Sequence, residues 1–387
     1  MILKDFIIVG GGIAGLSAIK AIREQNQSAS ILWISDEDRL PYKRTKINKH
    51  IAVGFSRDEF ALVEHDWLLT HHVELLFDRV IGIETAKHEL SFKHRGNLQY
   101  HKLIVAIGNK PRPLSINGLS QDMVFNVHNA RQVENIIRST SSSRTYMVVG
   151  AGVEGVETAD QLVQKGKKVI LVDRNSMVLQ RFFTPKYAAL LQDTIQKAGI
   201  QLLLDVHDID GSLGESVIQM NGQQYDVDTV ISTIGYTPNI ELAAASNIQC
   251  NVGIRVDEYM QTSAEDVFAA GDVAEHPSGE ITCLWHAAEY QGRVAGMNAC
   301  GIKTKLELKP FRMKTEVFGD YYLAVLPSKS SLEWVEEEKD DIVRDMYFDQ
   351  GKLEAVLMKN DGSRSKIYQT ALMEKWTRER INRELPL

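Results

Sequence analysis

The chain contains one short pattern twice, and this repeat limits its fold more than any other feature. An apolar strand runs into three glycines with the spacing G-x-G-x-x-G in FIIVGGGIAG, residues 6–15, and again in YMVVGAGVEG, residues 146–155. After a helical stretch, a second apolar strand ends in acidic residues, Asp36 and Glu37 in the first copy and Asp173 in the second. Strand, glycine turn, helix and acid-ended strand together predict an α/β dinucleotide-binding unit, and two copies predict two units.

Each glycine of the pattern has its own physical task. The first makes the tight turn, the second lets the backbone approach a pyrophosphate, and the third lets the helix pack close to the strand. The phosphates then lie at the helix N-terminus, where free N–H groups and the helix dipole favour negative charge. An acid at the end of the second strand accepts hydrogen bonds from ribose hydroxyls. The two sets of glycines are Gly10, Gly12 and Gly15, and Gly150, Gly152 and Gly155.

The acid of the second copy favours NADH over NADPH. A carboxylate at Asp173 accepts a hydrogen bond from a ribose 2′-hydroxyl and repels a 2′-phosphate. Arg174 follows directly and could pair with such a phosphate, so NADPH stays open as the second choice.

Length and composition narrow the class of protein. A chain of 387 residues is too long for a single core, so we expect two or three domains. Apolar residues make up 44% and charged residues 25%, as in ordinary globular proteins, and a net charge of -7 argues against a nucleic-acid partner. No apolar run approaches the ~20 residues that span a membrane, so we expect no integral membrane segment.

The cysteines and the chain start indicate a cytoplasmic protein. The three cysteines, Cys250, Cys283 and Cys300, lack CxxC spacing, so we expect neither a disulfide framework nor a metal site. Such cysteine usage is typical of a reducing cytoplasm. The first apolar stretch is interrupted by glycines and predicts a strand, turn and helix rather than a signal peptide.

Three further stretches, taken with the glycine turns, resemble a known family. They are YHKLIVAIGNKPR (100–112), VDTVISTIGYTPN (227–239) and TSAEDVFAAGDVAE (262–275). Over residues 1–310 the ordered set is similar to the FAD-dependent pyridine nucleotide reductases with two dinucleotide-binding folds. The resemblance implies that the first turn holds FAD, that the second holds NAD(P)H, and that the two strands ending in Ile-Gly cross between domains.

The expected fold class is therefore α/β, with two Rossmann-like domains and a small α+β C-terminal domain. In the C-terminal domain we expect a hairpin around Asp349 and Gly351 and a helix over about Gln369–Arg380. By resemblance it is the interface domain of rubredoxin-type reductases. The expected domains are FAD-binding (1–113 and 240–308), NADH-binding (114–239) and C-terminal (309–387).

Two segments resemble rubredoxin and ferredoxin reductases more narrowly. In SDEDRLPYKRTKINKHI (35–51) the resemblance implies that Arg44 lies by the flavin and that Lys49 contacts FAD. In RMKTEV (312–317) it implies that Lys314 reaches towards the flavin. We expect these three cations to form the catalytic set, because positive charge stabilises the reduced ring. The structural alternative for the loop cations is a solvated basic loop.

The resemblance also assigns individual cofactor contacts. Asp272 would bind the ribityl or phosphate end of FAD, Trp285 would stack near the ring, and Glu157 would lie near the nicotinamide pocket. Core packing for Trp285 and a helix-surface charge for Glu157 are the structural alternatives. The full set expected to bind cofactors is Gly10, Gly12, Ala14, Gly15, Asp36, Glu37, Arg44, Lys49, Val80, Ala106, Gly108, Gly150, Gly152, Gly155, Glu157, Asp173, Gly235, Gly271, Asp272 and Trp285.

This chain departs from the resemblance in three places, the first being Thr45-Lys46, where relatives have prolines after the arginine. Ala106-Ile107-Gly108 stands where the family usually has Ala-Thr-Gly, so one hydroxyl hydrogen bond is missing. Glu154 lies before the third glycine of the second turn, where relatives have an apolar or small residue. An acid there lies close to the expected NADH phosphates, and the sequence offers no reason for it.

The distribution of cysteines indicates where the electrons go. Disulfide reductases of this superfamily place a cysteine pair beside the flavin, but residues 36–60 and 114–239 contain none. Without a thiol no electrons pass to a disulfide. We therefore expect transfer from NADH through FAD to a small one-electron carrier, such as an acidic rubredoxin-like protein that docks by charge steering.

Two other functions stay open. A type II NADH:quinone reductase shares both folds but needs a membrane-binding C-terminus, and 369–387, with Leu372, Trp376 and Ile381, gives only a weak amphipathic signal. A flavoprotein redox sensor would use NADH to change its partner binding. The oligomeric state is expected to be monomer or homodimer.

Overall fold

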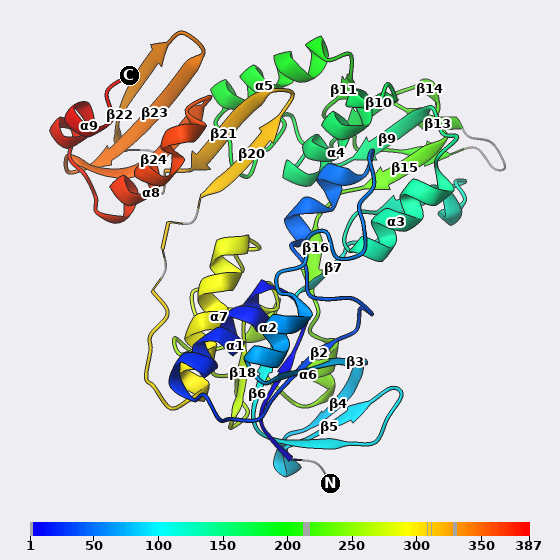
Figure 1. Cartoon of the computed structure of the whole chain (residues 1–387). Coiled ribbons are helices and arrows are strands. Elements are labelled where there is room, and N and C mark those ends of the chain that lie inside the picture. Colours follow the sequence, from blue (N-terminus) through cyan, green and yellow to red (C-terminus); the bar gives the residue numbers. More distant parts are fainter. Residues whose placement is uncertain (1–2, 212–216, 308, 311, 328–330) are drawn as a thin grey trace. The chain divides into compact units, whose positions relative to one another are not determined.

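The structure is a computed structural model that describes residues 3–211, 217–307, 309–310, 312–327 and 331–387. The chain divides into two compact units, each built from separate stretches of sequence (Figure 1). The first unit contains residues 1–46, 55–111 and 236–308, and the second contains 47–54, 112–235 and 309–387.

The first unit is built around a seven-stranded sheet in the order β3-β2-β1-β6-β5-β4, with β18 paired to β6. β1 lies between β2 and β6 and is parallel to both, whereas β4 and β5 form an antiparallel extension. The strands are β1 (Leu3–Val9), β2 (Ile31–Ser35), β3 (Val73–Phe77), β4 (Val80–Glu84), β5 (Glu89–Phe92), β6 (Leu98–Val105) and β18 (Val267–Ala269). Two short pairs, β7 (Asn109–Pro111) with β16 (Tyr236–Pro238) and β17 (Ile254–Arg255) with β19 (Ala274–Glu275), complete the unit. Its helices are α1 (Ile13–Gln25), α2 (His65–Thr70), α6 (Glu241–Ala245) and α7 (Trp285–Ala299).

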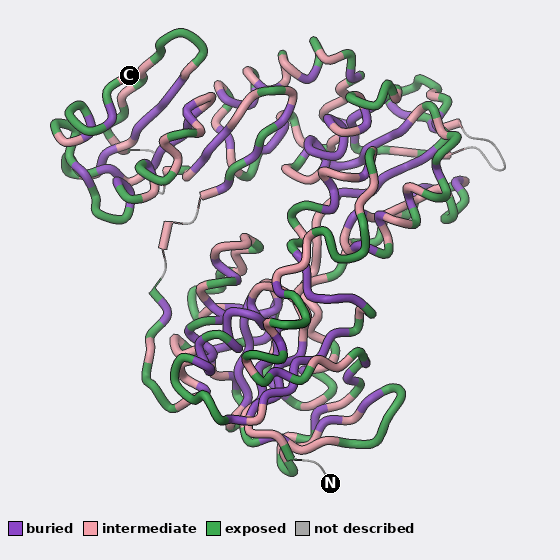
Figure 2. The backbone as a smooth tube through the Cα atoms, viewed as in Figure 1, coloured by how far each residue is buried: buried purple, intermediate pink, exposed green. Residues whose placement is uncertain are grey.

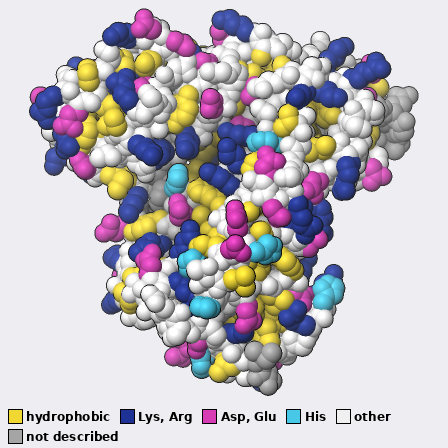
Figure 3. Space-filling model, viewed as in Figure 1, with side chains coloured by type: hydrophobic (Ala, Val, Ile, Leu, Met, Phe, Trp, Pro, Cys, Tyr) yellow, Lys and Arg dark blue, Asp and Glu magenta, His cyan; other side chains and the backbone are white. Residues whose placement is uncertain are grey.

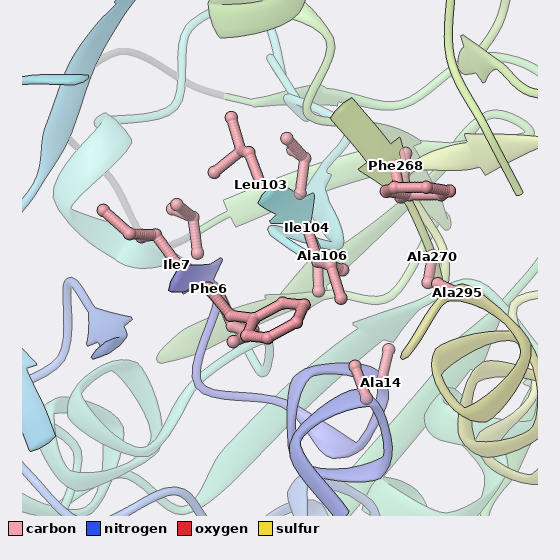
Figure 4. Close-up of a cluster of buried hydrophobic side chains, with 14 of the residues drawn as sticks. Phe6, Ile7, Ala14, Leu103, Ile104, Ala106, Phe268, Ala270 and Ala295 are labelled. Atoms are coloured by element: carbon pink, nitrogen blue, oxygen red, sulfur yellow. The ribbon is translucent and has the colours of Figure 1, made fainter. Parts of the chain in front are cut away.

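The central strands end in apolar residues, 6–9 in β1 and 103–105 in β6, because this part of the parallel sheet is buried on both faces. Ile7, Leu103 and Ile104 are fully buried, and Figure 4 shows them with Phe6 of β1 and Phe268 of β18. Figure 2 shows the same concentration of buried backbone in the strands. Acidic and basic side chains are mixed over most of the face in Figure 3.

Helices α1 and α7 pack with almost no side-chain layer between them. A Cβ atom added to Gly292 of α7 would lie 2.1 Å from the Ala14 carbonyl oxygen, and one added to Gly296 would lie 2.5 Å from that of Ala18. Small residues four apart on both helices therefore allow backbone contact. This contact fixes α1, whose N-terminus carries the first glycine turn.

The second unit contains a parallel sheet in the order β11-β10-β9-β15-β8. Its strands are β8 (Val124–Asn126), β9 (Thr145–Val149), β10 (Lys168–Val172), β11 (Gln201–Leu203) and β15 (Thr229–Ser232). A small antiparallel sheet is formed by β12 (Asp210–Gly211), β13 (Val217–Met220) and β14 (Gln223–Asp226). The helices of this part are α3 (Ala130–Ser139), α4 (Val153–Gln164) and α5 (Pro185–Lys197).

The last part of the second unit is an antiparallel sheet in the order β20-β21-β24-β23-β22. Its strands are β20 (Met313–Val317), β21 (Asp320–Val325), β22 (Glu333–Lys339), β23 (Ile342–Asp349) and β24 (Lys352–Lys359). The predicted hairpin is confirmed by β23 and β24. The acidic strand β22 lies at the edge of the sheet and is mostly exposed. The mixture of two Rossmann-like sheets and a small α+β part confirms the predicted fold class, while the exact domain boundaries stay a prediction.

The predicted C-terminal helix over Gln369–Arg380 is wrong in extent, because two short helices, α8 (Ser365–Met373) and α9 (Arg378–Glu384), stand there. Lys375 adopts a positive φ of 50° and breaks the helix. The backbone N–H of Trp376 then donates to Ala371, and the Thr377 side chain caps the second helix. Both helices pack their apolar side chains onto the sheet.

Side chains of α5 hold the C-terminal sheet. The buried Tyr187 hydroxyl donates to the Leu357 carbonyl at 3.0 Å, and the Lys186 ammonium bridges Asp345 at 2.9 Å and Glu336 at 2.7 Å. Burial and the nearby Asp345 carboxylate raise the pKa of Tyr187, so this hydroxyl stays protonated. In the described part of the chain, no helix has both the length and the apolarity to cross a bilayer.

We predict that Gly292→Ala lowers the free energy of unfolding of the protein by about 1–3 kcal/mol, the usual cost of overpacking. The added methyl group would overlap the Ala14 carbonyl and push α7 away from α1. Gly96→Ala is the matched control, because nothing lies within 4 Å of a Cβ at that glycine. Urea unfolding followed by circular dichroism measures both; equal stabilities of the two variants would contradict the packing argument.

Candidate cofactor sites

The first glycine turn lies against the end of strand β6. Gly10 has φ +127°, and a Cβ atom there would lie 2.0 Å from the Ala106 carbonyl oxygen. A Cβ on Gly15 would lie 2.5 Å from the Gly10 oxygen, which accepts a hydrogen bond from the Trp33 indole at 2.8 Å. Both glycines are therefore required by the protein's own backbone.

Gly12 is different, because nothing lies within 4 Å of a Cβ atom placed on it. It caps α1 with extended backbone and offers no side-chain hydrogen bond to the helix start. The open space faces N–H groups that have no partner within the helix. This arrangement fits a bound phosphate and so fits the pyrophosphate of FAD.

The acids after β2 have unequal surroundings. Asp36 is exposed, whereas the Glu37 carboxylate accepts hydrogen bonds from the Tyr42 hydroxyl at 2.9 Å and from the Arg44 guanidinium. The Arg44 guanidinium also lies 5.3 Å from the Tyr42 ring centre. Arg44 is thus tied to the acid-ended strand of the first unit rather than left as a free cation.

Asp272 lies in a turn that contacts helices α1 and α7 of the first unit. Gly271 before it donates its N–H to the Gln291 side chain of α7 at 2.9 Å, and a Cβ on Gly271 would lie 3.1 Å from that of Ala14. The Asp272 carboxylate accepts a hydrogen bond from the Asn109 amide at 2.8 Å. Burial raises the pKa of Asp272 to about 6, and the charge of Arg44 offsets part of this shift.

The second glycine turn repeats the first with other polar partners. A Cβ on Gly150 would lie 2.4 Å from the Thr233 carbonyl oxygen, and one on Gly155 would lie 1.8 Å from the Gly150 oxygen. The Thr233 hydroxyl donates to the Gly150 oxygen at 2.9 Å, as Trp33 does in the first turn. Gly152, like Gly12, has nothing within 4 Å of its Cβ position.

Asp173 lies beside the second glycine turn, as the sequence pattern predicts. Its carboxylate accepts hydrogen bonds from the backbone N–H groups of Ala151, in the turn, and of Asn175 at 2.8 Å. These bonds fix the carboxylate in position between the end of β10 and the turn. Glu154 is half-buried in the first turn of α4, and its purpose stays unexplained.

Glu157 is the centre of a polar cluster in the second unit. It is 7% exposed, and its carboxylate is bound by three side chains from two segments of the chain, 48–49 and 315. Asn48 donates to Oε2 at 2.7 Å, the Thr315 hydroxyl donates to Oε1 at 2.7 Å, and the Lys49 ammonium lies 2.8 Å from Oε1. The helix-surface alternative for Glu157 is therefore wrong. The arrangement stabilises an ionised carboxylate and holds the ammonium of Lys49 in one place.

The three predicted catalytic cations have different settings. Lys49 belongs to the Glu157 cluster, while Arg44 belongs to the other unit. Lys314 is exposed on β20, where residues alternate between faces, so it points away from the side on which its neighbour Thr315 contacts Glu157. The roles of all three at the flavin stay predictions.

The remaining predicted contacts lie at the ends of strands. Gly108 and Gly235 have φ of +63° and +95° and precede the paired strands β7 and β16. Trp285 begins α7 and is half-buried, with the Lys43 ammonium 5.6 Å from its ring centre. Val80 is buried at the start of β4.

Several polar residues that complete these sites could not be recognised from the sequence. Trp33 carried no signal beyond its residue type, and Asn48 lies within the segment 35–51 but its partner is 109 residues away. Thr233 had a signal, since it directly precedes the Ile-Gly pair of the second crossing strand. Asn109 and Thr315 each lie within a segment that the resemblance singles out, yet their contacts, 163 and 158 residues away, require the fold.

Comparison with known proteins assigns the chain to a family. The model of the pyridine nucleotide-disulphide oxidoreductases matches residues 4–292. The chain belongs to this family. Members of the pyridine nucleotide-disulphide oxidoreductases use FAD and NADH, and these are therefore the cofactors of the chain. The glycine turns described above fit both.

Relatives and solved structures agree with this assignment. The chain is 31% identical to the NADH oxidase of Methanocaldococcus jannaschii over 319 residues, covering 77% of this chain and 70% of that protein. It is 27% identical to the NADH-rubredoxin oxidoreductase of Clostridium acetobutylicum, covering 76% and 74%. The ferredoxin reductase for the CYP199A2 system from Rhodopseudomonas palustris superposes with a TM-score of 0.88 at 23% identity, covering 97% of this chain and 96% of that one, which supports the fold.

We predict that Gly152→Ala weakens NADH binding at least about tenfold and leaves FAD retention unchanged, while Gly12→Ala does the reverse. Each added methyl group enters space that the protein leaves open, so the loss reports on the ligand and not on folding. NADH titration and the FAD content of the purified variants measure the two effects. Similar losses of both cofactors in either variant would contradict the assignment of the turns.

Proposed function

We propose that this protein passes electrons from NADH through FAD to a small one-electron carrier protein, such as a rubredoxin-like acidic protein, without a redox-active disulfide. FAD, when bound, accepts two electrons from NADH and can release them singly. The observation that carries the proposal is the placement of the thiols, none of which belongs to either glycine turn or to the Glu157 cluster.

The three cysteines are poorly suited to relay electrons. None of them forms a disulfide in the described part of the chain, and burial raises the pKa of the Cys250 and Cys300 thiols, which lowers their reactivity as thiolates. Cys283 is exposed and precedes Trp285 by two residues, but no second cysteine lies near it in the sequence. A thiol–disulfide relay needs a pair that can close.

The residues of the second unit supply binding and charge. In this proposal Asp173, which the Ala151 N–H holds beside the second turn, accepts hydrogen bonds from the ribose of NADH. The exposed Arg174 beside it leaves NADPH as the weaker alternative. The Glu157 cluster holds the Lys49 ammonium in a fixed position. A fixed cation stabilises nearby negative charge better than a mobile one, because no reorganisation is needed when the charge appears.

Two relatives indicate which electron acceptors should be compared. The Clostridium relative is an NADH-rubredoxin oxidoreductase, which agrees with a protein acceptor. The Methanocaldococcus relative is an NADH oxidase, which makes oxygen the acceptor to compare. We favour the carrier protein because the chain offers no paired thiol.

The structure weakens the quinone-reductase alternative. The apolar residues that could have formed a membrane-binding face, Leu372, Trp376 and Ile381, are all buried in the core of the C-terminal part. They pack against the antiparallel sheet and leave no apolar face on α9 for a bilayer. Binding of the protein to liposomes in a flotation assay would restore this alternative.

The experiment that tests the proposal is stopped-flow reoxidation of the NADH-reduced holoenzyme. We expect rubredoxin to reoxidise it much faster than ferredoxin, a soluble quinone or oxygen does. Faster reoxidation by quinone or oxygen would overturn the proposed acceptor. Slow reoxidation by every acceptor would instead support the redox-sensor alternative.

We predict that Asp173→Ala raises the Michaelis constant for NADH about ten- to a hundredfold, because two ribose hydrogen bonds to a charged group are lost. The FAD content should not change, since Asp173 lies in the second unit beside the second turn. Steady-state kinetics and the flavin absorbance of the same preparation measure both. Asp36→Ala, at the corresponding acid of the first copy, is the control and should spare NADH. An equal loss of FAD and NADH in Asp173→Ala would mean that the turns are misassigned.

A further inference from the structure

Asn109 is a polar residue at the FAD end of the first unit to which no role has been given. It follows Gly108 directly, in the crossing strand where this chain has Ile107 and hence no hydroxyl group. Its side-chain amide donates to Asp272 Oδ2 at 2.8 Å. Within the described residues, this is the one hydrogen bond that the Asp272 carboxylate receives.

The backbone of Asn109 is fixed from the opposite strand. Asn239 donates its side-chain amide to the carbonyl oxygens of Ile107 at 2.8 Å and of Asn109 at 2.9 Å. The backbone N–H of Asn239 also donates to the Gly108 oxygen at 3.0 Å. These bonds involve backbone atoms, so a changed side chain at position 109 leaves the pairing of β7 with β16 in place.

The backbone of Asp272 is fixed independently of Asn109. The Gly271 N–H is held by Gln291, and Gly271 packs against Ala14 at the start of α1. Only the orientation and ionisation of the Asp272 side chain are then left to be determined. A single neutral donor on one oxygen sets the rotamer and leaves the other oxygen available to accept a ligand hydroxyl.

We propose that Asn109 is a positioning residue for FAD, which holds the Asp272 carboxylate so that its second oxygen can accept a hydrogen bond from a flavin hydroxyl. This inference rests on FAD as the cofactor and is independent of the electron acceptor. In this chain the side-chain amide of Asn109 would then replace the hydrogen bond of the hydroxyl group that Ile107 lacks.

The Asn109 amide matters for the ionisation of the Asp272 carboxyl group. Partial burial disfavours the ionised form of Asp272, and its pKa of about 6 lies close to physiological pH. In the described chain, desolvation raises the pKa of this carboxyl group, and Arg44 is the charged side chain that lowers it. A hydrogen bond to the ionised form lowers a carboxyl pKa, so loss of the Asn109 donor raises it further.

The test measures FAD binding to the apoprotein as a function of pH. For the wild type we expect affinity to fall as the pH drops through about 6, because protonation removes the charged acceptor. Asn109→Leu should weaken FAD binding at pH 7 about ten- to a hundredfold and move the midpoint of the pH profile upward. Asn109→Ser, which is too short to keep the bond, should behave similarly and covers the case in which the leucine variant does not fold.

A matched control and a double-mutant cycle separate positioning from a general structural effect. Asn97→Ala removes a similar amide–carboxylate bond, to Glu89 at 2.6 Å in the same unit, and should leave both affinity and profile unchanged. In an Asp272→Ala background, Asn109→Leu should have almost no further effect on FAD affinity. An unchanged midpoint in Asn109→Leu, or an undiminished effect without Asp272, would overturn the proposal.

Discussion

The structure depends on the close approach of two backbone segments, made once in each unit. In the first unit the glycine turn touches the carbonyl group at the end of β6, and in the second it touches the carbonyl group after β15. A Cβ atom would lie 2.0 Å from Ala106 in one case and 2.4 Å from Thr233 in the other. This contact brings the N-terminus of a helix, an acid-ended strand and a crossing strand to one place, which is what a dinucleotide site requires.

The two copies differ in how they satisfy the same polar groups. The carbonyl oxygen of Gly10 is bound by the indole of Trp33, whereas that of Gly150 is bound by the hydroxyl of Thr233. Glu37 of the first copy accepts hydrogen bonds from Tyr42 and Arg44, whereas Asp173 of the second accepts one from the turn itself. The same backbone geometry therefore carries two sets of side chains, consistent with two different dinucleotides.

Much of this arrangement could be predicted from the sequence, and the reasons for the exceptions are physical. Glycine spacing and apolar strands are local signals, so the two sheets, their turns and the hairpin at Gly351 could be anticipated. The break at Lys375 could not, because it depends on Trp376 packing into a core formed by distant strands. The three donors around Glu157 were equally hidden, since segments more than 100 residues apart supply them.

The central claim is that electrons leave the flavin without passing through a thiol. The exposed Cys283, two residues before Trp285, is the side chain that challenges it most. The most direct test is the turnover of the Cys250→Ser/Cys283→Ser/Cys300→Ser variant with NADH and rubredoxin. The account predicts turnover within about twofold of the wild type, together with reduction of the flavin by one equivalent of NADH. Loss of carrier reduction in a variant that still binds FAD and accepts electrons from NADH would contradict it.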